Sequence, residues 1–271
     1  MPVSLDQIVA ARRASVAAAR RSADLKALER AALAHTPRGF RRALEAAAAQ
    51  GVAVIAELKK ASPSRGLIRA EFNAAVLARE LEAAGAAALS VLTEEEHFQG
   101  SLANLRAASD ATRLPCLRKD FMVDEFQLLE ARACGADAVL LIVAALTDAD
   151  LSRLARRSQE LELDVLCEVH NQRELERAVA AGSTIIGVNN RDLRTFRVDL
   201  ETAVRLAPLI PPGAVRVAES GIHAAGDLRR LRAAGYQAFL IGESLMQAQR
   251  PGDTLAKLMG EASSFKLQVS S

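Results

Sequence analysis

The chain has 271 residues, of which 50% are hydrophobic and 25% charged, a composition typical of globular domains with a sizeable core. The formal net charge is +2 and only 3% of residues are aromatic, which argues against a nucleic-acid surface that stacks bases. No run of about 18 apolar residues is present to span a membrane, and arginines interrupt the N-terminus before the apolar region of a signal peptide forms. We therefore expect a cytoplasmic protein.

The first 50 residues predict a helical extension. A capping box at Ser4–Gln7 begins the first helix, and further helices are expected at Asp24–Ala34 and Phe40–Gln50, the last ending at Gly51. The apolar stripe of the first helix consists of Leu5, Ile8, Val9 and Val16. We expect residues 1–50 to pack on the domain that follows.

After residue 51 the sequence changes to short apolar segments that alternate with amphipathic helical stretches. Eight segments are expected to be strands: Val52–Lys59, Ala87–Leu92, Pro115–Lys119, Ala138–Val143, Val165–Val169, Ile185–Asn189, Val215–Glu219 and Ala238–Ile241. Repeated βα units indicate a parallel sheet, and the G-x-G-x-x-G of dinucleotide-binding folds does not follow the first strand. We therefore predict an α/β fold, a (β/α)8 TIM barrel over residues 51–260, with a tail at 261–271.

An internal repeat of glycines supports eight strands. An Ala-rich helix end, a glycine and then a strand recur at Gly85, Gly135, Gly182 and Gly235. The spacings are 50, 47 and 53 residues, about one (βα)2 unit each. Glycine suits the left-handed stop that turns a helix back into the next strand.

Three cysteines and four histidines predict no metal site. Cys116, Cys134 and Cys167 fall in apolar stretches without metal-ligand spacing, which favours buried free thiols in a reducing compartment. The histidines are scattered and form no H-x-x-x-H pair. We therefore assign no metal.

Polar residues collect at the C-terminal ends of the predicted strands. Barrel strands point alternate side chains inward, and the active site of this fold lies at the C-terminal mouth. Counted in twos from the inward apolar positions of the strands, seven polar residues also point inward: Glu57, Lys59, Lys119, Glu168, Asn189, Arg191 and Glu219. Charges inside a barrel cost on the order of several kcal/mol unless they are paired or used, so we predict that these side chains form one site.

Lysine is scarce in this chain, with six among 35 basic residues, yet Lys59 and Lys119 both lie at strand ends. A lysine near other charges can shift its pKa and donate a proton, whereas arginine stays protonated. Lys119 and Glu168 are therefore a candidate acid/base pair, because nearby opposite charges tune both groups.

Three loops indicate a phosphate site. Ser62–Ser64 follows the first strand, Ser220–Gly221 follows the seventh, and Gly242–Glu243 follows the eighth and begins a helix. Loops after strands 7 and 8, with the N-terminus of a short helix, form the usual phosphate site of this fold. We expect Arg191 to add a charge-assisted contact.

These segments together resemble the indole-3-glycerol phosphate synthase family. Residues 57–64 read E-L-K-K-A-S-P-S, similar to the family signature E-x-K-x-x-S-P-S. Further similar segments follow in family order: S-V-L-T-E-E at 90–95, L-R-K-D-F at 117–121, E-V-H at 168–170, G-V-N-N-R-D-L at 187–193, A-E-S-G-I at 218–222 and I-G-E-S-L-M at 241–246. The resemblance spans essentially all of residues 50–250, and the extension before the first strand also fits.

The resemblance implies the fourth step of tryptophan biosynthesis, without a cofactor or a metal. The substrate would be 1-(2-carboxyphenylamino)-1-deoxyribulose 5-phosphate, and the products indole-3-glycerol phosphate, carbon dioxide and water. Lys119 would be the general acid that protonates the ribulose carbonyl, and Glu168 the acid/base on the leaving hydroxyl. Lys59 would lie near the anthranilate carboxylate and is a second candidate acid for dehydration.

The resemblance also implies binding roles. Glu57 and Asn189 would orient the substrate and stabilise charge, and Glu219 would help to bind and position it. The phosphate would be held by Ser62, Arg191, Ser220, Gly221, Gly242 and Glu243. Phe98 and Phe121 would wall the anthranilate ring.

Two alternatives remain open. Another phosphate-binding barrel enzyme, such as phosphoribosylanthranilate isomerase, would require a cysteine in the first strand, where this chain has none. A non-catalytic barrel that binds a sugar phosphate would not need Lys119 and Glu168 as titrating groups. The expected partner is a small phosphorylated molecule, not nucleic acid or a membrane, and we expect a monomer, with a dimer as the alternative.

Overall fold

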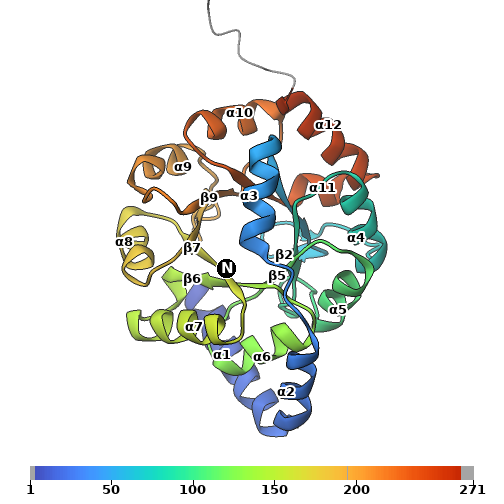
Figure 1. Cartoon of the computed structure of the whole chain (residues 1–271), viewed down its shortest axis with the longest axis vertical. Coiled ribbons are helices and arrows are strands. Elements are labelled where there is room, and N and C mark those ends of the chain that lie inside the picture. The colour runs from blue at the N-terminus through green and yellow to red at the C-terminus, as the bar shows by residue number, and fades with distance from the viewer. Residues whose placement is uncertain (1–3, 194, 264–271) are drawn as a thin grey trace, which may run out of the picture.

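Eight parallel strands close into a barrel in the computed structural model, which describes residues 4–193 and 195–263 (Figure 1). In their order around the ring the strands are β1 (Ala53–Leu58), β4 (Ala88–Leu92), β5 (Cys116–Lys119), β6 (Ala138–Ile142), β7 (Asp164–Val169), β8 (Ile185–Asn189), β9 (Val215–Glu219) and β10 (Ala238–Ile241). The predicted (β/α)8 barrel is therefore confirmed, and each predicted strand begins and ends within one residue of the observed one.

Helices follow the strands and form the outer layer of the barrel (Figure 1). They are α4 (Ala74–Ala83), α5 (Leu102–Ala111), α6 (Glu125–Ala133), α7 (Asp148–Glu160), α8 (Gln172–Ala180), α9 (Glu201–Leu206), α10 (Ala225–Ala233), α11 (Glu243–Gln247) and α12 (Pro251–Ser263), with the 3-10 turns η1 (Val143–Ala145) and η2 (Ala207–Leu209). The four repeated glycines all have positive φ, from 77° to 100°, as the predicted left-handed helix stops require. A short hairpin of β2 (Ala61–Ser62) and β3 (Gly66–Leu67) after β1 was not predicted.

The N-terminal extension runs along the outside of the barrel from one end to the other. It consists of α1 (Leu5–Ser22), α2 (Leu25–Ala34) and α3 (Phe40–Gln50), and α1 begins with the predicted capping box at Ser4. Figure 1 shows α2 beside α6, and α3 crossing in front of the strand ring. The extension thus contacts both the ring of helices and the end of the barrel.

Two apolar layers enclose the strands. The inner layer fills the barrel with the inward side chains Ala53, Ile55, Ala88, Leu117, Ala138, Leu140, Ile142, Leu166, Ile185, Val215, Val217, Ala238 and Leu240. Phe40 and Leu44 of α3 are fully buried against this layer, so α3 closes the N-terminal end of the barrel. The outer layer lies between the strands and the helices. The predicted inward positions are therefore confirmed.

A buried carboxylate ties the link between α2 and α3 to the barrel. Asp137, with a side chain that is 0% exposed, accepts hydrogen bonds from the Arg38 backbone N–H and guanidinium, at 2.6–3.1 Å. It also accepts from the backbone N–H of Cys116 in β5 at 2.6 Å, and His35 Nε2 lies 3.2 Å away. Burial raises the pKa of Asp137, but the hydrogen bonds from His35 and Arg38 outweigh burial and lower it.

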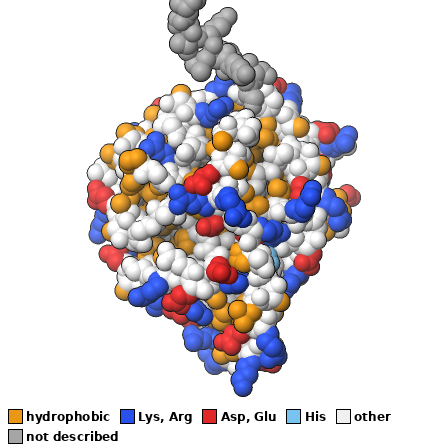
Figure 2. Space-filling model, viewed as in Figure 1, with side chains coloured by type: hydrophobic (Ala, Val, Ile, Leu, Met, Phe, Trp, Pro, Cys, Tyr) orange, Lys and Arg blue, Asp and Glu red, His pale blue; other side chains and the backbone are white. Residues whose placement is uncertain are grey.

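The surface mixes charges of both signs. Figure 2 shows acidic and basic side chains interspersed over the face that carries α3. Within the described ranges, no helix is both long enough and apolar enough to cross a membrane. The tail predicted from residue 261 overlaps α12, which runs to residue 263, and its remainder at 264–271 lies outside the described residues.

Candidate active site

Four charged side chains form one layer across the C-terminal end of the barrel. Glu57, Lys119, Glu168 and Glu219 come from β1, β5, β7 and β9, which are alternate strands of the ring. In barrels of this type each inward layer takes four side chains from alternate strands. Two residues earlier, the same strands supply the apolar layer below: Ile55, Leu117, Leu166 and Val217. The polar cluster is thus the last layer of the barrel interior.

Lys119 lies at the centre of this layer. Its Nζ is 3.6 Å from Glu168 Oε2 and 3.9 Å from both Glu57 Oε2 and Glu219 Oε2. Lys59 Nζ is 2.8 Å from Glu57 Oε1. The three carboxylates are at most 4% exposed, so two ammonium groups and three acids share a nearly dry space.

The electrostatic consequences differ from one group to the next. Burial lowers the pKa of Lys119, but the carboxylates of Glu168, Glu57 and Glu219 outweigh burial and raise it. For Glu57, burial raises the pKa while Lys59 and Lys119 lower it further, so the net shift is downward. For Glu219, burial and the neighbouring Glu168 both raise the pKa, well above its ordinary value. Lys119 and Glu57 are therefore held charged, whereas Glu219 is biased toward the neutral acid.

Two glycines make room for the acids. A Cβ at Gly187 in β8 would lie 2.1 Å from Glu219 Oε1, and a Cβ at Gly242 would lie 2.3 Å from Glu57 Oε1. Any side chain at either position would displace a carboxylate. The close packing of the charged layer thus depends on the absence of side chains on its neighbours.

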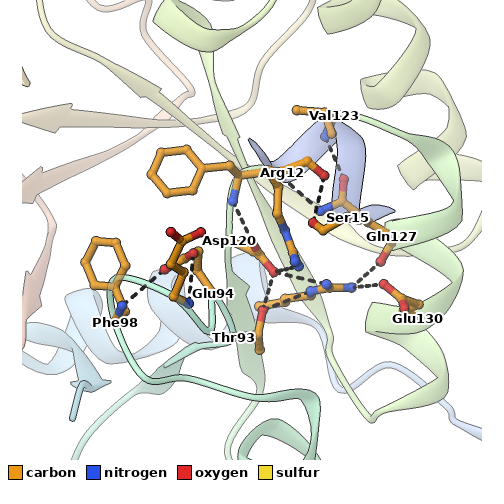
Figure 3. A network of polar contacts seen from close by, with 12 residues as sticks. Arg12, Ser15, Thr93, Glu94, Phe98, Asp120, Val123, Gln127 and Glu130 are labelled. Atoms are coloured by element: carbon orange, nitrogen blue, oxygen red, sulfur yellow. Dashed lines mark hydrogen bonds and ion pairs between the residues drawn. The ribbon is translucent and has the colours of Figure 1, made fainter. Parts of the chain in front are cut away.

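An aromatic wall borders the charged layer. The rings of Phe98 and Phe121 lie 6.5 Å apart, centroid to centroid, at a tilt of 46°. Phe98 is placed by Glu94, whose carboxylate accepts the backbone N–H of Phe98 at 3.1 Å and that of His97 at 2.8 Å (Figure 3). Phe121 is placed by the preceding Asp120, whose Oδ1 accepts its N–H at 2.8 Å.

Serine and glycine loops also line the site, and Ala61 N, beside Ser62, donates a hydrogen bond to Phe98 O at 3.2 Å. Ser220 and Gly221 after β9 both have positive φ, 65° and 78°. Ser62 lies in β2, and Arg191 Nη2 is 3.3 Å from Glu243 Oε2 at the start of α11. Since the Glu243 side chain is itself an anion, only its backbone N–H is suited to bind phosphate. Its carboxylate instead holds Arg191, and also Arg65 at 2.9 Å.

All fourteen predicted site residues line one cavity. They are Glu57, Lys59, Ser62, Phe98, Lys119, Phe121, Glu168, Asn189, Arg191, Glu219, Ser220, Gly221, Gly242 and Glu243. Pro63 and Ser64 of the predicted phosphate loop also line it. The same cavity is lined by residues that were not predicted: Leu5, Ile8, Leu92, Ile142, Leu193, Phe196, Ile222, His223, Leu240, Ile241 and Ser244. Leu5 and Ile8 belong to α1, so the extension forms part of the wall. Their apolar spacing predicted a packed helix face but not which surface that face contacts.

His170 is a further neighbour of the charged layer that was not predicted as a site residue. Its Nε2 lies 3.4 Å from Glu168 Oε1, and its Nδ1 lies 3.0 Å from Glu174 Oε2. Burial lowers the pKa of His170, but the hydrogen bond with Glu174 and the charge of Glu168 outweigh burial and raise it. The only signal in the sequence for this contact is that His170 is the last residue of the E-V-H segment at 168–170, two residues after Glu168.

Within the described ranges, one group of side chains has the spacing of a metal site, and one of its members already has other partners. Ligand atoms of Glu94, Glu96 and His97 lie within 4.8 Å of one another, but the Glu94 oxygens already accept backbone N–H groups of the turn that leads to Phe98. Cys116 and Cys167 are buried free thiols, as predicted. Cys134, the C-cap of α6, is also a free thiol, but the prediction of burial is wrong for it because it is only partly buried.

The closed ring of βα units, with a charged layer at the strand ends and glycine-containing loops after β9 and β10, defines a (β/α)8-barrel enzyme with its site at the mouth. Residues 5–258 match the family described as indole-3-glycerol phosphate synthase. The chain belongs to this family.

Relatives of high identity carry the name of this family, and solved structures of low identity share the fold. The chain is similar to the indole-3-glycerol phosphate synthase of Koribacter versatilis, with 60% identity covering 96% of this chain and 100% of the relative. It is 50% identical to that of Acidithiobacillus ferrooxidans, covering 94% and 97%. The fold is similar to 3-hexulose-6-phosphate synthase from Salmonella typhimurium (13% identity, TM-score 0.63, covering 78% and 98%) and to thiamine phosphate pyrophosphorylase from Pyrococcus furiosus (16%, 0.60, 81% and 98%). The family match and the two relatives support the predicted synthase family and give no support to the isomerase or to a non-catalytic barrel. The two solved structures support the barrel fold.

Proposed function

We propose that the chain closes the ring of 1-(2-carboxyphenylamino)-1-deoxyribulose 5-phosphate to form indole-3-glycerol phosphate, carbon dioxide and water. The observation that carries this proposal is the Lys119 ammonium, surrounded by Glu57, Glu168 and Glu219 in a cavity that an aromatic wall and serine–glycine loops also line. This arrangement supplies an acid for a carbonyl, carboxylates for later proton transfers, and separate places for a ring and a phosphate. The reaction makes the chain a carbon–carbon lyase.

Ring closure needs a proton at the carbonyl oxygen. The ring carbon that bears the carboxylate forms a bond to the ribulose carbonyl carbon, and the carbonyl oxygen takes a proton from Lys119 Nζ and becomes a hydroxyl. The neighbouring carboxylates, Glu168 first, keep Lys119 protonated, but they also make it a weak acid. A substrate that separates Lys119 from one of these carboxylates would strengthen the acid at the moment of reaction. The raised pKa of Glu219 acts in the same direction, because a neutral Glu219 holds the ammonium less strongly.

Decarboxylation and dehydration complete the indole. The carbon–carbon bond to the carboxylate breaks, carbon dioxide leaves, and the electron pair of that bond restores the aromatic ring. The new hydroxyl then leaves as water with a proton from an acid, while the adjacent CH2 carbon gives up a proton to a base. Glu168 acts on the leaving hydroxyl, and Lys59, near the anthranilate carboxylate, is the second candidate acid. The aromatic wall favours loss of the carboxylate by keeping it out of bulk water.

The remaining residues bind and orient the substrate. Glu57 and Asn189 orient it and stabilise charge, and Glu219 helps to position it. The phosphate is held by Ser62, Arg191, Ser220, Gly221 and the backbone at Gly242 and Glu243. Backbone N–H groups in glycine-containing turns approach phosphate oxygens closely, and the Arg191 guanidinium adds a charge-assisted contact. The chemistry calls for no metal and no cofactor, and we place the enzyme in the cytoplasm as a monomer.

The proposal is tested by following indole fluorescence as the purified protein acts on this substrate. Lys119→Met and Lys119→Arg should each reduce kcat by at least about 10²-fold, the scale of general acid catalysis, because neither side chain can release a proton. Substrate binding should remain measurable by calorimetry in both variants. Fluorescence growth at the wild-type rate in either variant would contradict the assigned role of Lys119, and an inactive wild type would contradict the function itself.

A further inference from the structure

A nearly buried ion pair holds α1 to the end of β5. Arg12 Nη2 lies 2.5 Å from Asp120 Oδ2, and the two side chains are 17% and 0% exposed (Figure 3). Asp120 directly follows Lys119 and precedes Phe121, so the pair is one residue from the proposed acid and one from the aromatic wall. A buried pair of this geometry specifies one arrangement of the two segments more strongly than an exposed pair does.

Asp120 is the centre of a larger polar network. Its Oδ2 also accepts hydrogen bonds from Thr93 Oγ1 at 2.6 Å and from Arg118 Nη2 at 3.0 Å (Figure 3). Arg118 is fully buried and its Nη1 also contacts Glu130 Oε2 at 3.1 Å. Because Arg118 remains beside Asp120 when Arg12 is removed, the loss of Arg12 does not leave the carboxylate without a cation.

The same helix reaches the cavity with apolar side chains. Leu5, Ile8 and Arg12 follow a 3–4 spacing and therefore share one face of α1. Leu5 and Ile8 line the cavity, whereas Arg12 lies outside it and contacts Asp120. The ion pair is thus the most buried polar contact between the first half of α1 and the segment that carries Phe121. Val9, which packs beside Val16, and Arg13, whose Nη2 lies 3.5 Å from Asp150 Oδ2 with a side chain that is 46% exposed, add weaker contacts.

The second half of α1 is attached independently. Val16 packs with Val123 and Phe126, and Arg20 Nη1 lies 3.2 Å from Asp124 Oδ2 with side chains 57% and 32% exposed. These contacts keep the helix docked when Arg12 is changed. A loss of the Arg12 contact would therefore loosen the cavity end of α1 and leave the far end in place.

We infer that Arg12 and Asp120 are positioning residues that fix α1 against the aromatic wall, so that Leu5, Ile8 and Phe121 form one surface for the ring of the substrate. The identity of that ring rests on the proposed function. The pair acts on binding of the ring and not on proton transfer, because neither side chain lines the cavity.

The test compares Arg12→Met, Arg12→Lys and the matched control Arg20→Met, which removes an exposed ion pair from the same helix. In assays of indole formation, Arg12→Met should raise KM by about tenfold, as expected when about 1.4 kcal/mol of binding is lost, and change kcat by less than about threefold. Arg12→Lys should recover part of the affinity, and Arg20→Met should leave KM and kcat unchanged. An unchanged KM in Arg12→Met, or a fall in kcat alone, would overturn the inference.

A second measurement does not depend on the proposed function. Amide hydrogen exchange in residues 5–12 of the ligand-free protein should become faster in Arg12→Met than in Arg20→Met, while residues 16–22 stay protected in Arg12→Met. Equal exchange in residues 5–12 of both variants would show that the pair does not hold the cavity end of α1. If the wild type forms no indole but the exchange result is as expected, the function fails and the positioning role stands.

Discussion

At the scale of single residues, Glu219 is a buried acid whose carboxylate has unusually few polar partners. It is 1% exposed, and within the described residues its two carboxylate oxygens accept no hydrogen bond. Burial and the nearby Glu168 raise its pKa, which is the pattern of a carboxylate pair with only one strongly acidic member. Such a group is retained at a cost in stability, which is common in active sites.

Glu219→Gln should therefore stabilise the protein at high pH and impair it as an enzyme. A carboxyl whose folded pKa is raised contributes stability below its unfolded pKa, about 4.3, and loses that contribution as pH rises through the folded value. The variant lacks this titration, so its free energy of unfolding at pH 8 should exceed that of the wild type by about 1 kcal/mol, or about 2–4 °C in Tm. We expect kcat/KM to fall at least tenfold.

Urea denaturation at pH 5, 7 and 8 measures this effect. Glu45→Gln is the control, because Glu45 is an exposed member of an i,i+4 pair with Arg41 and should shift stability by less than about 0.5 kcal/mol. A Glu219→Gln protein less stable than the wild type at every pH would show that the carboxylate is favourably placed.

At the scale of elements, β8 depends on a position without a side chain. Gly187 faces the barrel interior between Glu219 and Leu166, and an added Cβ would lie 2.1 Å from Glu219 Oε1 and 3.1 Å from Leu166 Cδ1. The register aligns Gly187 with Glu168 on β7 and with Val217 on β9. The strand therefore leaves the space that the Glu219 carboxylate on the neighbouring strand β9 requires.

Gly187→Ala should move Glu219 and disturb the charged layer. We expect a loss of about 1–3 kcal/mol, typical of overpacking, and a fall of at least tenfold in kcat/KM. Gly226→Ala is the matched control, since Gly226 lies exposed in α10 with its nearest neighbour 3.8 Å from the added Cβ, and it should be neutral or stabilising by up to about 1 kcal/mol. Thermal unfolding and the indole assay together decide the outcome, and full activity in Gly187→Ala would refute the packing account.

The strands were predictable because their signal is local. Strands that are buried on both faces, such as β6 (A-V-L-L-I), appear in the sequence as short continuous apolar runs. In β5 and β7, the residue two positions after an inward apolar side chain is Lys119 or Glu168. The β2–β3 hairpin has two residues per strand and leaves no periodicity to detect. The contact of His170 with Glu168 depends on how a loop turns after β7, which a pattern of residue types does not encode.

At the scale of the whole molecule, the extension is attached at both ends of the barrel. Arg12 fixes α1 near the mouth, and Arg38 fixes the α2–α3 link at the opposite end through Asp137. The helices of the extension were predictable from caps and spacing, but their contacts were not. Arg12 and Asp120 are 108 residues apart in the chain, and no local pattern pairs them.

Arg38→Ala should strongly destabilise the fold, because it leaves Asp137 buried with little compensation. Removing one partner of a buried pair typically costs about 3–5 kcal/mol. Arg113→Ala is the control, since the Arg113 side chain is 99% exposed and should contribute less than about 0.5 kcal/mol. Because the folded pKa of Asp137 is lowered, its contribution is present above the unfolded pKa of about 3.9 and is lost as pH falls through the folded value.

Urea denaturation at pH 7 and at pH 3 checks both statements. The stability difference between wild type and Arg38→Ala should shrink at the lower pH, because protonated Asp137 no longer needs a cation. A difference below about 1 kcal/mol at pH 7 would mean that the remaining hydrogen bonds to Asp137 suffice.

Because Phe40 and Leu44 of α3 close the N-terminal end of the barrel, they also determine by which route substrate and products can enter and leave. With that end filled, substrate enters and all three products leave by the same opening, past the first turns of α1. Substrate therefore cannot bind until the organic product has dissociated from the cavity. Indole-3-glycerol phosphate should accordingly act as a competitive inhibitor whose escape limits how soon the next turnover begins.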